Sequence, residues 1–124
     1  MGISTHRAAF AACLLLAAIA IPAASQDNAK KLSGTYAIAG KDAIDPPPDQ
    51  PKDTHLQLFL AGSAAKDLYN ALKVKATADE CTGANAKSKF QGAIACTMLD
   101  GGKEYECSFA VDLKNQKLEA IYAC

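Results

Sequence analysis

The stretch from Tyr105 to Leu113 constrains the fold of this chain more than any other. Large apolar side chains alternate strictly with polar or small ones along it. The apolar set is Tyr105, Cys107, Phe109, Val111 and Leu113. Strict alternation is typical of a β-strand that buries one face. We therefore expect a strand here, with Glu104, Glu106 and Asp112 on its solvent face.

A hairpin before this strand is predicted by Asp100-Gly101-Gly102-Lys103. The two glycines can adopt the positive φ values that a two-residue turn needs. Such a turn sets the apolar positions of 105–113 opposite those of a preceding strand, in the order Met98, Cys96, Ile94, Gly92 and Phe90. These positions are apolar apart from the glycine, so two independent patterns support one register.

A second hairpin is predicted at Lys114–Lys117, before the segment Leu118–Cys124. A tight turn at Asn115-Gln116 places Leu118 and Cys124 on the buried face, with Cys124 directly opposite Cys107. The C-terminal part of the chain is thus expected to form a three-stranded antiparallel meander.

Four cysteines are expected to form two disulfides: Cys81, Cys96, Cys107 and Cys124. We expect Cys107–Cys124, because opposed Cα atoms at a non-hydrogen-bonded site lie about 4.5 Å apart, and Cys81–Cys96 is the pair that remains. The competing pairing is Cys96–Cys107, which leaves Cys81 for Cys124. A zinc site built from the four thiolates is disfavoured, because no close C-x-x-C pair is present.

The N-terminal residues predict an export signal. A basic start, His6-Arg7, precedes an apolar run from Ala8 to Ile21, and the small residues Ala23 and Ser25 follow. We expect cleavage between Ser25 and Gln26, because the apolar run is shorter than the roughly 20 residues that span a bilayer. The protein is then periplasmic or secreted, where disulfides persist.

The charge balance argues against some partners. Thirteen Lys and Arg residues match thirteen Asp and Glu residues. A chain without excess positive charge has no electrostatic drive toward nucleic acid or anionic lipid. We therefore expect no nucleic-acid partner, and no membrane attachment once the signal is removed.

The mature chain divides into two parts. Residues 26–53 hold an expected strand, Gly34–Gly40, and an extended surface loop, Lys41–Asp53, which contains four of the five prolines. Residues 54–124 are expected to form the domain core. Within them, Val74–Ala78 is either a short strand or an extended link.

A strand and a helix are expected at the start of the core. Thr54–Leu60 alternates leucines with His55, Gln57 and Phe59, so we predict a strand. Ser63 is a good N-cap, and the apolar residues that follow at helical spacing predict one helix over Ser63–Lys73.

These elements together predict an α+β fold. It contains an antiparallel sheet of four to five strands, with one helix packed on one face and two disulfides. The other sheet face is expected to stay wet.

The residues that could perform chemistry are few. His55 is interpreted as an exposed histidine at a strand end, because no nucleophile or partner is placed beside it in the sequence. The acidic side chains on the solvent face, joined by Glu119, are interpreted as solvated charges rather than a hydrolase pair. We therefore expect no catalytic, cofactor-binding or metal-binding residue, and no enzymatic activity.

Three segments carry a resemblance: "GSAAKDLYNAL", "DECTG" and "YECSFAVDL". They resemble a group of small exported proteins of proteobacteria, in which a G-x-A-A-K-x-L-Y helix start precedes C-T-G and a Y-x-C-S-F strand. The similarity covers Leu56 to Leu113. It implies a periplasmic, disulfide-stabilised protein, and because the motifs carry no assigned activity, no functional residue is carried over.

The function expected from these observations is protein binding or inhibition in the periplasm or outside the cell. Two surfaces are candidates for the partner contact: the proline-rich loop, with Asp45, Pro46, Pro47 and Pro48, and the acidic face, with Glu104, Glu106 and Glu119. A structural or envelope-stress protein without a ligand is one alternative, and a small hydrolase using the exposed carboxylates is another.

Overall fold

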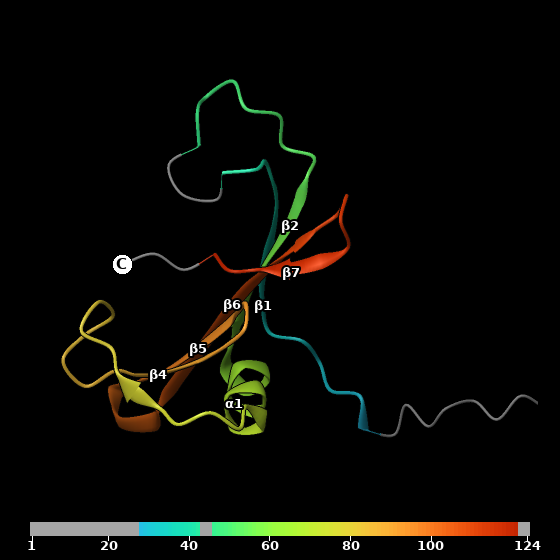
Figure 1. The fold of residues 1–124 in the computed structure, drawn as a ribbon. Coiled ribbons are helices and arrows are strands. Elements are labelled where there is room, and N and C mark those ends of the chain that lie inside the picture. The colour runs from blue at the N-terminus through green and yellow to red at the C-terminus, as the bar shows by residue number, and fades with distance from the viewer. Residues whose placement is uncertain (1–27, 43–45, 122–124) are drawn as a thin grey trace, which may run out of the picture.

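The computed structural model describes residues 28–42 and 46–121 of the chain. They form a seven-stranded antiparallel sheet with one α-helix on one face (Figure 1). The α+β class is confirmed, although the sheet has more strands than the four to five predicted. The elements in chain order are β1 (Gly34–Ala39), β2 (His55–Ala61), α1 (Gly62–Ala71), β3 (Thr77–Ala78), β4 (Lys87–Gln91), β5 (Ile94–Leu99), the 3₁₀ turn η2 (Asp100–Gly102), β6 (Glu104–Asp112) and β7 (Lys117–Glu119).

β6 is the central strand because it pairs with three others. β2 lies along one side of it, from Ala61 opposite Glu106 to His55 opposite Asp112. On the other side, β5 pairs with the first half of β6 and β7 with the second half. β1 borders β2 at one edge of the sheet, and β4 and β3 follow β5 toward the other edge.

The predicted register between β5 and β6 is confirmed. Met98 lies opposite Tyr105, and Cys96 lies opposite Cys107. The turn between them is longer than the predicted two residues, because Asp100 starts a 3₁₀ turn. Gly101 and Gly102 have φ values of 67° and 96°, which is the left-handed backbone that their lack of a Cβ allows.

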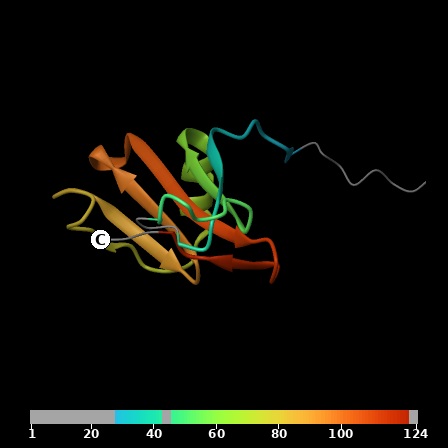
Figure 2. The ribbon, with the colours of Figure 1, turned by 90° about the horizontal axis from the view of Figure 1, so that it is seen from above.

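The segment 90–98 is predicted to be one strand, but in the structure it is divided between two strands. β4 ends at Gln91 and β5 begins at Ile94, so the chain reverses at Gly92, whose φ is 60°. The glycine interpreted as a gap in an apolar row is therefore a turn residue. This hairpin and the short strand β3 give the sheet its additional strands, and Figure 2 shows β4, β5 and β6 as neighbours that run in alternating directions.

The register predicted for the last strand is wrong by two residues. Leu118 lies opposite Val111 rather than Leu113, because the turn is wider than two residues and begins at Asp112, whose carbonyl accepts a hydrogen bond from the Gln116 amide. A shift of two residues keeps every side chain on its predicted face. β7 ends at Glu119, so no described pairing reaches Cys124.

The disulfide of the sheet joins Cys96 and Cys107. Both preferred pairings, Cys107–Cys124 and Cys81–Cys96, are therefore wrong. The reason is the β5–β6 register, which sets the two cysteines directly opposite each other on adjacent strands. Cys81 is disulfide-bonded as well, and Cys124 lies outside the described residues.

The helix α1 starts at Gly62, one residue before the predicted start. Gly62 has a φ of 58°, a left-handed conformation that lets the chain turn directly from β2 into the helix. The prediction that Ser63 is the N-cap is wrong, because Ala61 takes that position and makes no side-chain capping hydrogen bond. At the other end, the Lys89 ammonium donates hydrogen bonds to the carbonyls of Tyr69 and Leu72, at 2.9 and 3.0 Å.

The hydrophobic core lies between α1 and one half of the sheet. Its buried members are Ala65, Tyr69, Leu72, Cys96 and Cys107. The helix is short, and Figure 1 shows it at the opposite end of the sheet from the loop that joins β1 and β2. It therefore covers the first half of β6 and leaves the second half of that face without a helix.

Within the described residues, no helix is both long and apolar enough to cross a membrane.

Candidate functional site

The sheet face opposite α1 is buried where the sequence predicts a wet surface. His55, Gln57 and Asp112 are between 6% and 9% exposed, and Ala110 is 1% exposed. The register explains this, because Gln57 and Glu119 both pair with Ala110, and His55 pairs with Asp112. The prediction of an exposed His55 is therefore wrong.

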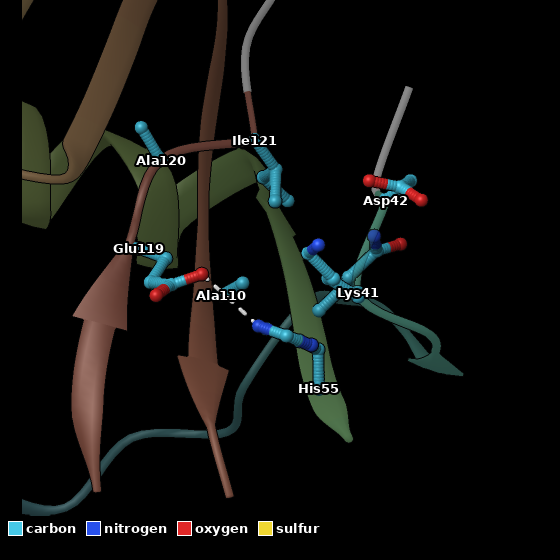
Figure 3. A pocket seen from close by; sticks show the side chains of 8 residues that line it. Lys41, Asp42, His55, Ala110, Glu119, Ala120 and Ile121 are labelled. Atoms are coloured by element: carbon cyan, nitrogen blue, oxygen red, sulfur yellow. Dashed lines mark hydrogen bonds and ion pairs between the residues drawn. The ribbon is translucent and has the colours of Figure 1, made fainter. Parts of the chain in front are cut away.

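The imidazole of His55 is hydrogen-bonded at both nitrogens. Its Nε2 lies 3.0 Å from Oε2 of Glu119 (Figure 3). Its Nδ1 lies 2.8 Å from the Thr54 hydroxyl oxygen. That hydroxyl also donates a long hydrogen bond, 3.4 Å, to the carbonyl of Ala39. The histidine is thus fixed between β1, β7 and the start of its own strand.

The two carboxylates near His55 are held in their charged form. Hydrogen bonds from the Lys117 ammonium, and then from His55, lower the pKa of Glu119. The Asn115 backbone amide, followed by its side-chain amide, lowers the pKa of Asp112. Asp112 also accepts a hydrogen bond from the Lys114 amide, so it anchors the β6–β7 turn.

These three side chains form a cluster with the composition of a metal site. One ligand atom from each of His55, Asp112 and Glu119 lies within 4.8 Å of the others. No metal-binding residue was predicted, because the sequence contains no signal for the pairing of β2 with β6. That pairing alone brings His55 beside Asp112.

A pocket of about 240 Å³ opens beside His55 and Glu119 (Figure 3). Its wall contains both polar and apolar side chains, which are Lys41, Asp42, His55, Gln57, Ala110, Glu119, Ala120 and Ile121. The chain that leaves β1 and the chain that follows β7 supply half of these residues, and strands β2, β6 and β7 supply the others. The pocket is therefore built from segments that are far apart in the sequence.

The residues predicted to contact a partner do not form one surface. Pro46, Pro47 and Pro48 are exposed in the loop, and Asp45 lies outside the described residues. Glu104 and Glu106 are exposed, whereas Glu119 lines the pocket. Glu119 pairs with Ala110, four positions along β6 from Glu106, which is about 13 Å at the rise of a strand.

On the sheet face that α1 packs against, the half that the helix leaves uncovered carries two rows of apolar side chains. They cross the sheet in register, as Tyr36–Leu58–Phe109 and Ile38–Leu56–Val111–Leu118. Tyr36 is 72% exposed, and Ile38 and Leu118 are 46% and 47% exposed. This surface was not predicted, because the helix was expected to pack over the apolar face of the sheet. We refer to these two rows as the open apolar face.

Comparisons of this chain with protein-family models, curated proteins and solved structures find no match. The resemblance to small exported proteins of proteobacteria therefore stays a prediction.

Proposed function

We propose that this protein is a small exported module that binds another protein through its open apolar face and the adjoining edge strand β1. Export rests on the basic and apolar pattern of residues 1–25, with removal of that segment before Gln26. The Cys96–Cys107 disulfide suits an oxidising compartment such as the periplasm. Inhibition of an enzyme is one form that such binding takes.

The exposure of Tyr36 carries this proposal. Large aromatic side chains are enriched in the energetic centres of protein interfaces, and Tyr36 is 72% exposed at the end of an apolar row. Leu58 and Phe109 continue that row inward and are half-buried. Apolar side chains gathered on one exposed surface are typical of a protein-binding site.

The edge strand β1 adds hydrogen-bonding groups to this surface. Among the described strands, β1 pairs with β2 alone, so its outer edge has no strand beside it. Its sequence, GTYAIA, has neither the charge nor the proline that usually protects an edge from other chains. The partner that fits is an extended segment that pairs with β1 and places apolar side chains beside Tyr36 and Ile38.

Of the two surfaces predicted from the sequence, the loop adjoins the proposed binding face and the acidic surface does not. The loop Asp45–Asp53 connects β1 to β2, so its prolines can flank a partner bound at the β1 edge. Glu104 and Glu106 lie on the face opposite the open apolar face, and they stay a separate prediction for a second contact.

In the test, the immobilised protein first captures a partner from periplasmic extract, and that partner is then purified. We expect Tyr36→Lys and Ile38→Lys each to weaken the complex at least tenfold, because each buries a charge in an apolar contact. The matched control is Ala78→Lys, which adds the same charge to β3 at the far edge of the sheet. Equal affinities for all three variants would exclude the open apolar face, and a loss confined to Glu104→Lys and Glu106→Lys would move the contact to the acidic surface.

A further inference from the structure

We propose that His55, Asp112 and Glu119 bind a divalent transition-metal ion, of which Zn²⁺ is the best fit. An imidazole with two carboxylates is a nitrogen–oxygen ligand set that such ions accept in proteins. The three groups come from β2, the end of β6 and β7, and the pairing of these strands places them together. This inference is independent of the proposed protein-binding face, which lies on the other side of the sheet.

The spacing of the ligand atoms agrees with a small metal ion. Nε2 of His55 and Oε2 of Glu119 are 3.0 Å apart. Zinc bonds of about 2.0–2.1 Å at a tetrahedral angle set two ligand atoms about 3.3 Å apart, so these two need to separate by only a few tenths of an ångström. The Asp112 oxygen lies within 4.8 Å of both of these atoms.

The imidazole is oriented as a metal ligand requires. A ligating histidine usually donates the hydrogen of its other nitrogen to a neighbouring group, which fixes the ring and its tautomer. The Thr54 hydroxyl lies 2.8 Å from Nδ1 and can accept that hydrogen, while its own hydrogen points to the Ala39 carbonyl. When Nδ1 carries the ring hydrogen, Nε2 presents its lone pair toward Glu119, and a metal ion between the two atoms takes the place of the hydrogen bond that joins them.

The carboxylate of Asp112 is held in place in the same manner. Its Oδ1 accepts hydrogen bonds from the amides of Lys114 and Asn115, and its Oδ2 accepts one from the Asn115 side chain. Oδ2 keeps a lone pair for a metal ion, and outer hydrogen bonds of this kind support ligating carboxylates. Asp112 is 6% exposed, so the site is shielded from water on this side.

Charges around the cluster decide how strongly it binds. Two carboxylates balance the charge of a divalent ion, whereas Lys117 lies 3.2 Å from Oε1 of Glu119 and competes for it. The Lys117 side chain is 60% exposed, so it can leave Glu119 at little cost. Lys41 and Lys114 line a second pocket, whose wall also contains His55, Asp112 and Glu119, and their positive charges weaken the binding of a cation there.

The test is a zinc titration, by isothermal calorimetry, of the purified exported protein with its disulfides intact and stripped of metal with a chelator. We expect one Zn²⁺ per chain, with at least tenfold weaker binding in His55→Gln and in Glu119→Gln. The control is Glu106→Gln, which removes an exposed carboxylate from the same sheet face and is expected to bind as the wild type does.

A second measurement separates ligation from folding. The absorption bands of Co²⁺ report its coordination, and we expect bands in the wild type that change in Glu119→Gln, while circular dichroism of that variant stays native. Zinc binding that is absent in the wild type, or unchanged in His55→Gln and Glu119→Gln, would overturn the proposal. In that case, the cluster is an ion pair that fastens β7 to β2.

Discussion

Ser88 shows how a single buried hydroxyl organises this small domain. It is fully buried, and its Oγ lies 2.5 Å from Oδ2 of Asp79 and 2.7 Å from the Thr97 hydroxyl. Asp79 also accepts hydrogen bonds from the amides of Cys81 and Thr82. The network therefore joins the turn that carries the disulfide-bonded Cys81 to strands β4 and β5.

This network predicts a stability that depends on pH. The hydrogen bond from Ser88, followed by that from Thr82, lowers the pKa of Asp79 in the folded state. Because the folded pKa lies below the unfolded value of about 3.9, the stabilisation is complete above that value and is lost as the pH falls through the folded pKa. Ser88→Ala is expected to lower the free energy of unfolding by about 1–3 kcal/mol at neutral pH, since Asp79 and Thr97 both lose a buried partner.

The measurement is urea unfolding of the wild type and of Ser88→Ala from pH 7 to pH 3. The difference between them is expected to narrow at the acid end. Ser63→Ala is the control, because Ser63 is exposed and does not cap the helix, so its curve should follow that of the wild type throughout. A difference that stays constant with pH would contradict the role of Asp79.

At the scale of elements, the sequence predicted what is local and missed what is distant. The alternation of 105–113 and the glycines before it were sufficient for β6 and its register with β5, because a hairpin encodes its own pairing. The helix followed from its apolar stripe. The pairing of β2 with β6 was not predictable, because the segments between them contain no signal for which distant strand β2 joins.

Gly92 was predicted to lie within a strand, but it forms the turn between β4 and β5, and this role can be tested. Its φ is 60°, and a Cβ added there would meet no atom within 4 Å. Substitution therefore costs backbone strain and little else. Gly92→Ala is expected to destabilise the domain by about 1 kcal/mol, and Gly92→Asn by less, because asparagine tolerates the left-handed region better. Thermal unfolding of the two variants measures this order, and a stability of Gly92→Ala equal to that of the wild type would mean that the β4–β5 turn relaxes to another form.

At the scale of the whole molecule, the candidate sites lie where the helix and the connecting segments cover the sheet only in part. The ten-residue helix leaves half of one face open, and the chain around β1 and β7 encloses part of the other. Composition and periodicity describe which side chains share a face, but not how far a short helix reaches across it. Tyr36 was for this reason assigned no role from the sequence, whereas the role of His55 depends on the unpredicted pairing of β2 with β6.

The expected disulfide pairing connects the C-terminus to the turn that carries Cys81, and it can be tested. The Cys96–Cys107 bond excludes both pairings that the sequence favoured, and Cys81 is also disulfide-bonded. If residues 1–25 are removed as proposed, Cys124 is the cysteine that remains, so we expect a Cys81–Cys124 bond. Peptide mapping without reduction should yield one fragment that links Cys81 to Cys124 and another that links Cys96 to Cys107. A fragment that joins two protein chains through Cys81 or Cys124 would contradict this expectation.

The central position of β6 has a consequence for the order of folding. Its contacts with β5 and, through β5, with β4 are made by neighbouring hairpins, which close quickly because little chain entropy is lost. β2 comes from the other half of the chain, so its pairing with β6 is non-local and belongs to the slow part of the reaction. The cluster of His55, Asp112 and Glu119 and the open apolar face both require β2 in place. A chain in which only the β4–β5–β6 hairpins have formed therefore lacks both sites, so binding at either site requires the non-local pairing of β2 with β6.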